Sequence, residues 1–242
     1  MGCGGSGQLT AAVKDEQMQQ QRLPSIGEGQ QTRPILVHSL LVEEEIQHIK
    51  SLSAEVSRRN QKIHCMRSGW STRYLHVDGL FQRKAPALLQ KLINAAVAAD
   101  AGPAGWKLLS QTHKRGRLNP RVIEHHSVTP GGALSDKDHF DQGSLVTIDV
   151  MLSRPDEDFD GGRFCTSEGV AEHEAHHFSK GDALIFVSHK YHFVQPVVRG
   201  KREVLVIELW EGRAPHCDHR CGVNFGRCAF EDSRRHERVD MG

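Results

Sequence analysis

The sequence predicts a mainly β domain, a sandwich or barrel, with supporting α-helices before it in the chain. Two observations lead to this prediction. Apolar residues recur at helical spacing up to Trp106 and alternate with polar residues beyond it. Short β-rich runs then follow, most of them separated by turns that contain glycine or proline. They cover residues 121–128, 145–152, 163–166, 182–188, 192–197 and 203–210.

Two helices are expected before these strands. The first begins at the acidic run 43–45, which favours a helix N-terminus, and has apolar residues at helical spacing up to Val56. The second begins near Pro86, because proline fits the first helical turn, and ends at Gly102-Pro103. Each helix should bury one face.

Length and composition favour one catalytic-size domain with short extensions. The 242 residues include 31 Lys and Arg and 30 Asp and Glu, and this near balance disfavours nucleic-acid binding by bulk charge. We expect a disordered Gly- and Gln-rich tail at 1–33, a helical support region at 34–118, a β core at 119–212 and a Cys- and His-bearing tail at 213–242. No basic region followed by an apolar region, as in a signal peptide, occurs in the sequence, and no apolar run reaches about 20 residues, so we expect a cytoplasmic protein.

The start of the chain leaves a membrane-anchored form open. Gly2 stands where N-myristoylation occurs, and Cys3 beside it can accept a palmitoyl group. Two acyl chains together anchor a protein stably, whereas one does not. The alternative interpretation is a flexible glycine-rich terminus.

The pair His139-x-Asp141 is the first chemical signal. In an extended segment, side chains two residues apart point the same way, so the imidazole and the carboxylate converge. His192 heads a later β-rich run and supplies a third ligand. Two histidines and one carboxylate leave open metal positions, the arrangement of non-haem Fe(II) oxygenases. Arg202, ten residues beyond His192, can present a two-pronged donor to the carboxylate of a co-substrate.

A second register has the same ten-residue spacing, because His189 precedes Arg199 by ten positions. Arg199 lies next to a turn glycine, whereas Arg202 shares strand parity with Val204 and Val206 on an apolar face. The parity favours the register that uses Arg202, with His189 as a neighbour of the site.

Four motifs occur in a fixed order along the chain. They are His139-x-Asp141, the turn Phe-Asp-Gly-Gly-Arg-Phe at 159–164, the run Gly-Asp-Ala-Leu-Ile-Phe at 181–186, and His192-x-Val-x-Pro-Val-x-x-Gly-x-Arg202. Over about residues 121–210 the chain therefore resembles the Fe(II)- and 2-oxoglutarate-dependent dioxygenases, in the prolyl and lysyl hydroxylase-like branch. The resemblance implies a double-stranded β-helix, or distorted jelly roll, packed on N-terminal helices. It also implies that His139, Asp141 and His192 bind catalytic Fe(II) and that Arg202 binds the distal carboxylate of 2-oxoglutarate.

The reaction implied by the resemblance is hydroxylation of an unactivated C–H bond on a peptidyl or protein side chain. It is coupled to oxidative decarboxylation of 2-oxoglutarate to succinate and CO2, with O2 as co-substrate and L-ascorbate (vitamin C) as reductant. Collagen-type prolyl hydroxylases carry lysine at the position of Arg202, so the collagen substrate is not transferred to this chain. A small-molecule substrate stays open, and the access loops that would select the substrate are expected at 66–84 and 167–180.

Two other functions are compatible with these motifs. A nucleic-acid demethylase-type oxygenase can also use arginine for 2-oxoglutarate, but the near-neutral charge and 6% aromatic content disfavour it. A catalytically silent metal-binding β-barrel is the other alternative. It is disfavoured because a binding module has no need for the co-substrate arginine Arg202.

The strand expected at 145–152 has two different faces. Val146, Ile148, Val150 and Leu152 form an apolar face that should pack outward, and Thr147, Asp149 and Met151 form a mixed face. A cavity for a dianionic co-substrate needs such a mixed lining. Thr147 can therefore offer a hydroxyl to 2-oxoglutarate and Asp149 can contact substrate, or both are ordinary edge residues.

Further cysteines and histidines carry weaker signals. The C-terminal cysteines are Cys217, Cys221 and Cys228, and the additional histidines are His173, His176 and His177. Zinc sites more often show Cys-x2-Cys pairs, so free thiols or one disulfide are favoured over a metal site for the cysteines. The histidines are expected on an exposed loop or strand edge.

Overall fold

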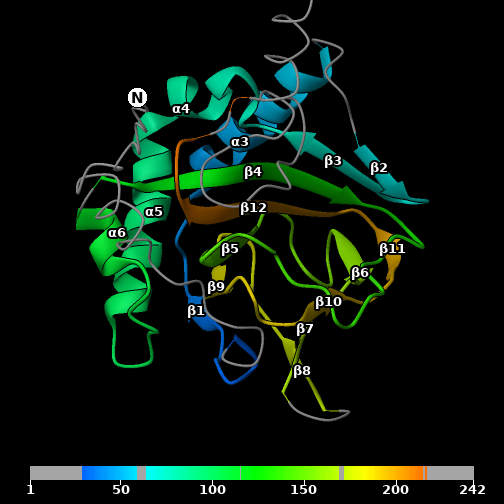
Figure 1. The fold of residues 1–242 in the computed structure, drawn as a ribbon. Helices are drawn as coiled ribbons and strands as arrows, with labels where there is room; N and C mark the ends of the chain where they lie inside the picture. The colour runs from blue at the N-terminus through cyan, green and yellow to red at the C-terminus, as the bar shows by residue number, and fades with distance from the viewer. Residues whose placement is uncertain (1–28, 59–63, 115, 169–171, 215, 217–242) are drawn as a thin grey trace, which may run out of the picture.

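The helices cover one face of a large antiparallel β-sheet, and two smaller sheets lie on its other face (Figure 1). The structure, a computed structural model, describes residues 29–58, 64–114, 116–168, 172–214 and 216. Its helices are α3 (Glu43–Arg58), the 3-10 helix η1 (Val77–Gly79), α4 (Leu80–Lys84), α5 (Pro86–Ala101) and α6 (Ser110–Lys114). Its strands are β1 (Ile35–Val37), β2 (His64–Arg67), β3 (Trp70–Tyr74), β4 (Leu118–Val128), β5 (Val146–Met151), β6 (Phe159–Gly161), β7 (Phe164–Ser167), β8 (His173–His176), β9 (Ala183–Val187), β10 (His192–Val194), β11 (Val197–Gly200) and β12 (Arg202–Glu211).

The sheets have the connectivity of a jelly roll. Within the described residues, the large sheet has the order β1-β9-β5-β12-β4-β3-β2, and the smaller sheets have the orders β10-β7-β8 and β11-β6. Every pair of named strands among them is antiparallel. The predicted mainly β fold, a distorted jelly roll packed on N-terminal helices, is confirmed.

Two apolar cores hold the layers together. The first joins the helices to the outer face of the large sheet and includes Ile49 of α3, Leu92 of α5 and Ile148 of β5, each fully buried. The second lies between the sheets and includes Phe186 of β9 and Phe164 of β7. Burying each such side chain stabilises the fold by about 1.5–3 kcal/mol.

The two faces of β5 pack as the alternation predicts. Val146, Ile148 and Val150 belong to the core on the helix side, and Met151 belongs to the core between the sheets. The other members of the mixed face, Thr147 and Asp149, are also buried. This face therefore lines the interior of the jelly roll, where polar groups need partners.

Both predicted helices are confirmed. Helix α3 begins at the acidic run and buries one face, because its apolar residues recur every three or four positions up to Val56. Helix α5 has Pro86 in its first turn and ends at Ala101, because the backbone becomes extended at Gly102.

The region 34–118 is more than a helical support. It contributes β1, β2 and β3 to the large sheet, and β3 pairs with β4. The prediction of an access loop over 66–84 is therefore wrong for most of that segment. The segment forms a strand because buried and half-buried residues alternate in β3, where Trp70, Thr72 and Tyr74 are buried and the residues between them are half-buried.

The run 192–197 forms two strands instead of one. β10 ends at Val194 and pairs with β7, whereas β11 begins at Val197 and pairs with β6. Pro196 lies between them and has no N–H to donate to a ladder, so the pairing changes partner there.

The described part of the predicted tail 1–33 is ordered. Residues 29–33 contact the turn between β9 and β10 through Gln30, so the boundary at 33 lies too far along the chain. Gly2, Cys3, Cys217, Cys221 and Cys228 lie outside the described residues, and their acylation, disulfide or metal binding stay predictions. None of the helices in the described ranges is both long and apolar enough to span a membrane.

His125 makes the stability of the fold dependent on pH. Its Nδ1 lies 2.7 Å from Ser53 Oγ, in the buried contact between β4 and α3. Burial lowers the pKa of His125 from 6.5 to about 3, and the nearby carboxylate of Glu203 only partly opposes this. As the pH falls from 6.5 toward 3, His125 becomes protonated in the unfolded chain but stays neutral in the folded protein. The folded state therefore loses stability over this pH range.

We expect His125→Gln to reduce this acid sensitivity. At about two pH units below the ordinary pKa of histidine, His125 lowers the unfolding free energy of the wild type by about 3 kcal/mol. Urea unfolding at pH 7 and pH 4.5 measures the difference. His48→Gln, an exposed change on α3, should keep the wild-type dependence. Equal pH dependence of wild type and His125→Gln would contradict the assignment.

Candidate metal centre

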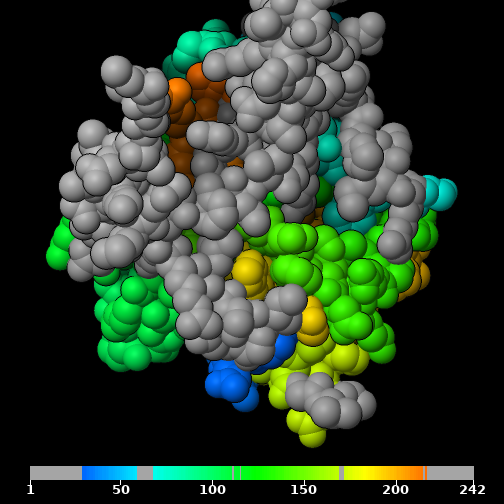
Figure 2. Space-filling model, in the orientation of Figure 1, coloured from blue at the N-terminus to red at the C-terminus, as the bar shows by residue number. Residues whose placement is uncertain are grey.

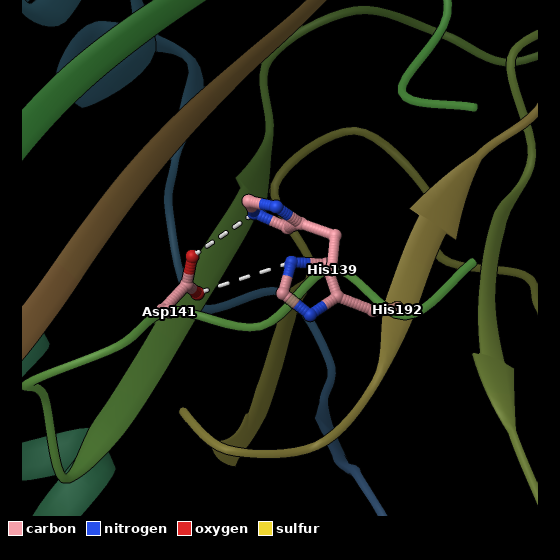
Figure 3. A group of neighbouring side chains, drawn as sticks. All are labelled: His139, Asp141 and His192. Carbon is pink, nitrogen blue, oxygen red and sulfur yellow. Dashed lines mark ion pairs between the residues drawn. The ribbon is translucent and has the colours of Figure 1, made fainter. Parts of the chain in front are cut away.

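Three side chains from two distant segments of the chain lie close together (Figure 3). His139 and Asp141 lie in the loop before β5, and His192 is the first residue of β10. Their ligand atoms all lie within 4.8 Å of one another. The Asp141 carboxylate has Oδ1 3.5 Å from His139 Nε2 and Oδ2 3.9 Å from His192 Nε2.

Backbone hydrogen bonds bring the two segments together. The N–H of His192 donates to the carbonyl of His139 at 2.9 Å, and the N–H of Asp141 donates to the carbonyl of Ser188 at 2.8 Å. The loop before β5 is thus fixed to both ends of the β9–β10 connection. The three ligand side chains converge because of these main-chain contacts.

The tautomer of His192 follows from its hydrogen bond. Its Nδ1 lies 2.9 Å from the carbonyl oxygen of Lys190, which can only accept, so Nδ1 carries the proton. The Nε2 lone pair then faces Asp141, as metal binding requires.

Thr147 holds the carboxylate in place. Its Oγ1 donates to Asp141 Oδ2 at 2.7 Å and lies 2.9 Å from Ser188 Oγ. The hydroxyl predicted to contact 2-oxoglutarate therefore lies against the carboxylate of Asp141. In this arrangement Thr147 orients Asp141.

Two of the sequence motifs pack around His192. Phe164 of the 159–164 turn stacks on its ring at 5.4 Å between centroids and an angle of 21°. Phe186 of the 181–186 run meets it edge-on at 5.0 Å. The side chain of His139 is 28% exposed while those of Asp141 and His192 are almost fully buried, so solvent reaches the centre beside His139.

Arg202 lies on the interior face of the large sheet at the start of β12 and is only 1% exposed. Within the described residues, its buried Nε and Nη2 have no hydrogen-bond partner. Burial lowers its pKa to about 10, so the guanidinium is still charged at neutral pH. A buried cation with unsatisfied N–H groups is costly, and an anionic two-oxygen ligand removes that cost.

Gly162 leaves room for this arginine. A Cβ at position 162 would lie 3.0 Å from Arg202 Cδ and 2.9 Å from Val197 Cγ2. Its φ of +58° is also a conformation that favours glycine. Gly162 of the 159–164 motif thus allows the arginine to enter the interior.

Asp149 is a second buried charge beside Arg202. It lies on the mixed face of β5, opposite Val206 of β12 and Leu184 of β9. Burial raises its pKa to about 7, the charge of Arg202 opposes this, and the Asp141 carboxylate adds to the increase. Partial protonation of Asp149 near neutral pH would limit its repulsion of any anion at Arg202.

The alternative register does not reach the centre. Arg199 is exposed and pairs with Asp160, with Nε 2.6 Å from Oδ2. The ring of His189 packs against Phe140, with centroids 5.5 Å apart. Neither side chain joins the ligand group formed by the described residues.

A second cluster of possible ligands went unnoticed in the sequence. Glu168, Glu174 and His176 come together beside β8, an exposed edge strand, as expected for its histidines. Its carboxylates are paired with cations, since Lys190 Nζ lies 3.1 Å from Glu168 and Arg33 Nη1 2.9 Å from Glu174. No local pattern signals this grouping, because it depends on the hairpin of β7 and β8.

Comparison of the sequence with protein-family models and with curated proteins gives no match. Solved structures do match. An oxidoreductase of the 2OG-Fe(II) oxygenase family from Burkholderia pseudomallei is 12% identical with a TM-score of 0.53, over 80% of this chain and 88% of that chain. A prolyl hydroxylase from Trichoplax adhaerens, in complex with a hypoxia inducible factor peptide fragment, is 13% identical with a TM-score of 0.51, over 85% and 94%. The chain therefore has the fold of the 2-oxoglutarate- and Fe(II)-dependent oxygenases.

Proposed function

We propose that the protein is an Fe(II)- and 2-oxoglutarate-dependent dioxygenase that hydroxylates an unactivated C–H bond. The observation that supports this best is the combination of the His139, Asp141 and His192 group with the buried, unsatisfied guanidinium of Arg202. A metal-binding module without activity needs the first feature and has no use for the second. A co-substrate with a metal-binding keto acid end and a distal carboxylate would use both.

The residues present fit the two groups. Two imidazoles and one carboxylate suit Fe(II) and leave coordination positions for other ligands. The guanidinium of Arg202 fits the distal carboxylate of 2-oxoglutarate in shape and charge. When bound, iron, 2-oxoglutarate and O2 supply the oxidation of the C–H bond, with CO2 and succinate as co-products and L-ascorbate as the reductant for iron.

The chain's own residues bind, orient and exclude water. His139, Asp141 and His192 bind the metal, with Asp141 oriented by Thr147. The rings that pack on His192 shield it from water, which strengthens charge interactions in the site. The exposed side of His139 gives the substrate a route to the centre.

A peptidyl or protein side chain is the proposed substrate, with a small molecule as the alternative. The likeness to the prolyl hydroxylase solved in complex with a peptide fragment supports the first choice. A nucleic-acid substrate is less well supported, because the net charge of the chain is +1.

The decisive experiment incubates iron-loaded protein with 2-oxoglutarate, ascorbate and peptide libraries. Succinate formation and a mass increase of one oxygen atom in a peptide are expected. Turnover of 2-oxoglutarate without any modified peptide would support a small-molecule substrate. Absence of both 2-oxoglutarate binding and succinate would contradict the proposal.

Thr147→Val should weaken metal binding, because valine keeps the shape but cannot donate to Asp141. Loss of a group that orients a metal ligand typically costs about 10–100-fold in affinity. Titration with Co(II) as a probe for the iron site measures the effect. Thr147→Ser keeps the hydroxyl and should stay close to wild type. Equal Co(II) affinity of the valine variant and wild type would exclude the orienting role.

A further inference from the structure

The turn between β9 and β10 supports both buried ligands. The carbonyl of Ser188 accepts the N–H of Asp141, and the carbonyl of Lys190 accepts the Nδ1–H of His192. A shift of this turn would therefore move Asp141 and rotate the ring of His192 together. What holds the turn from outside matters for the metal centre.

Gln30 holds this turn, although it lies about 160 residues away in the sequence. Its side-chain Nε2 donates to the carbonyl of His189 at 2.7 Å, and its Oε1 accepts the N–H of Tyr191 at 3.0 Å. Its backbone carbonyl accepts a hydrogen bond from Lys190 Nζ at 2.8 Å. One residue thus contacts every member of the turn from 189 to 191.

The segment around Gln30 is shaped for this contact. A Cβ at Gly29 would lie 2.8 Å from the His189 carbonyl oxygen, so the close approach requires glycine there. Thr32 closes a short turn by donating its hydroxyl to the Gly29 carbonyl at 2.6 Å. Lys190 is fully buried and also pairs with Glu168, which fixes its ammonium group beneath Gln30.

The segment also contacts the smaller sheet at the protein surface. Figure 2 shows the blue N-terminal segment beside the yellow-green region of β7 and β8 at the lower edge of this face, and Arg33 Nη1 lies 2.9 Å from Glu174 Oε2. That pair is exposed and contributes little. The specific contacts are those of Gln30.

We propose that Gln30 is a positioning residue of the metal centre. Through the 189–191 turn it fixes the carbonyl that binds His192 Nδ1 and thereby the direction of Nε2. This inference rests on the proposed function, because it assumes that His139, Asp141 and His192 bind a metal. Outer groups that orient ligands are typically worth about 10–100-fold in metal affinity.

The test replaces Gln30 by methionine in the full chain. Methionine has the length of glutamine but cannot form the two side-chain hydrogen bonds, so the volume is kept and only polar contacts are lost. Gln31→Met is the matched control, because Gln31 is the same residue type one position on and is exposed. Co(II) serves as the probe, and its affinity and visible absorption spectrum are measured together with thermal unfolding of the metal-free protein.

Gln30→Met is expected to weaken Co(II) binding about tenfold and to change the Co(II) spectrum, while Gln31→Met does neither. Gln30→Glu, which keeps the acceptor for Tyr191 but loses the donor to His189, should show a loss in the same direction and serves if the methionine variant does not fold. Wild-type Co(II) affinity and spectrum in folded Gln30 variants would overturn the inference and leave the proposed function standing. Failure of the wild type to bind Co(II), or undiminished binding by His192→Ala, would overturn both.

Discussion

Replacing His139, Asp141 or His192 by alanine is expected to lower succinate formation from 2-oxoglutarate by more than about 100-fold, because even the outer partners of metal ligands are worth 10–100-fold. Each change removes one of the donors that meet within 4.8 Å. The two ligands that are left bind iron weakly and cannot fix where the co-substrate chelates. All three variants should fail in the same way, since the ligands act as one unit.

The measurement uses purified protein at saturating iron, so that weak metal binding and loss of the reactive geometry are separated. His48→Ala is a suitable control, because this histidine is exposed on α3, which packs on the outer face of the large sheet. Undiminished succinate formation by an iron-replete ligand variant would remove that residue from the site. Titration with Co(II) in the absence of 2-oxoglutarate gives the metal affinity of each variant independently of turnover.

Local patterns were sufficient for the parts of this fold that depend on neighbouring residues. The alternation of β5 separated Val146 and Ile148, which face the helices, from Thr147 and Asp149, which face the interior. That parity does not reveal what an interior hydroxyl will contact. Thr147 meets Asp141 only because the loop before β5 folds back onto the strand.

Contacts between distant segments explain the other differences. β1 is three residues long and becomes a strand only because β9 offers it a partner. Gln30 looked like part of a polar tail, since nothing near it in sequence indicates that its amide matches the turn at 189–191. His192 and Arg202 are the first residues of β10 and β12, and the turn at Gly200 leads into β12.

Arg202→Ala is expected to raise the KM for 2-oxoglutarate by about 100-fold or more, because two charge-assisted hydrogen bonds are worth about 1.5–3 kcal/mol each. The shift should vanish for 2-oxopentanoate, which has the same keto acid end but no distal carboxylate. Wild type should therefore distinguish the two oxo acids strongly, and the alanine variant should not. Arg202→Lys keeps the charge but loses the planar guanidinium, so its KM for 2-oxoglutarate should lie between those of wild type and Arg202→Ala.

Arg199→Ala is the matched control, because that arginine is exposed, pairs with Asp160 and lies three positions away. If Arg199→Ala raised the KM and Arg202→Ala did not, the alternative register with His189 would be correct.

A second measurement separates binding from a structural role for Arg202. Its Nε and Nη2 are buried without a partner within the described residues, so the guanidinium should destabilise the protein when no anion is bound. Arg202→Met, of similar length and without charge, is therefore expected to raise the free energy of unfolding of the ligand-free protein while it abolishes stabilisation by 2-oxoglutarate. A structural arginine would give the opposite result, with a loss of stability in both conditions. If Arg202→Met increases the stability of the ligand-free protein and removes the stabilisation by 2-oxoglutarate, Arg202 serves ligand binding and destabilises the fold.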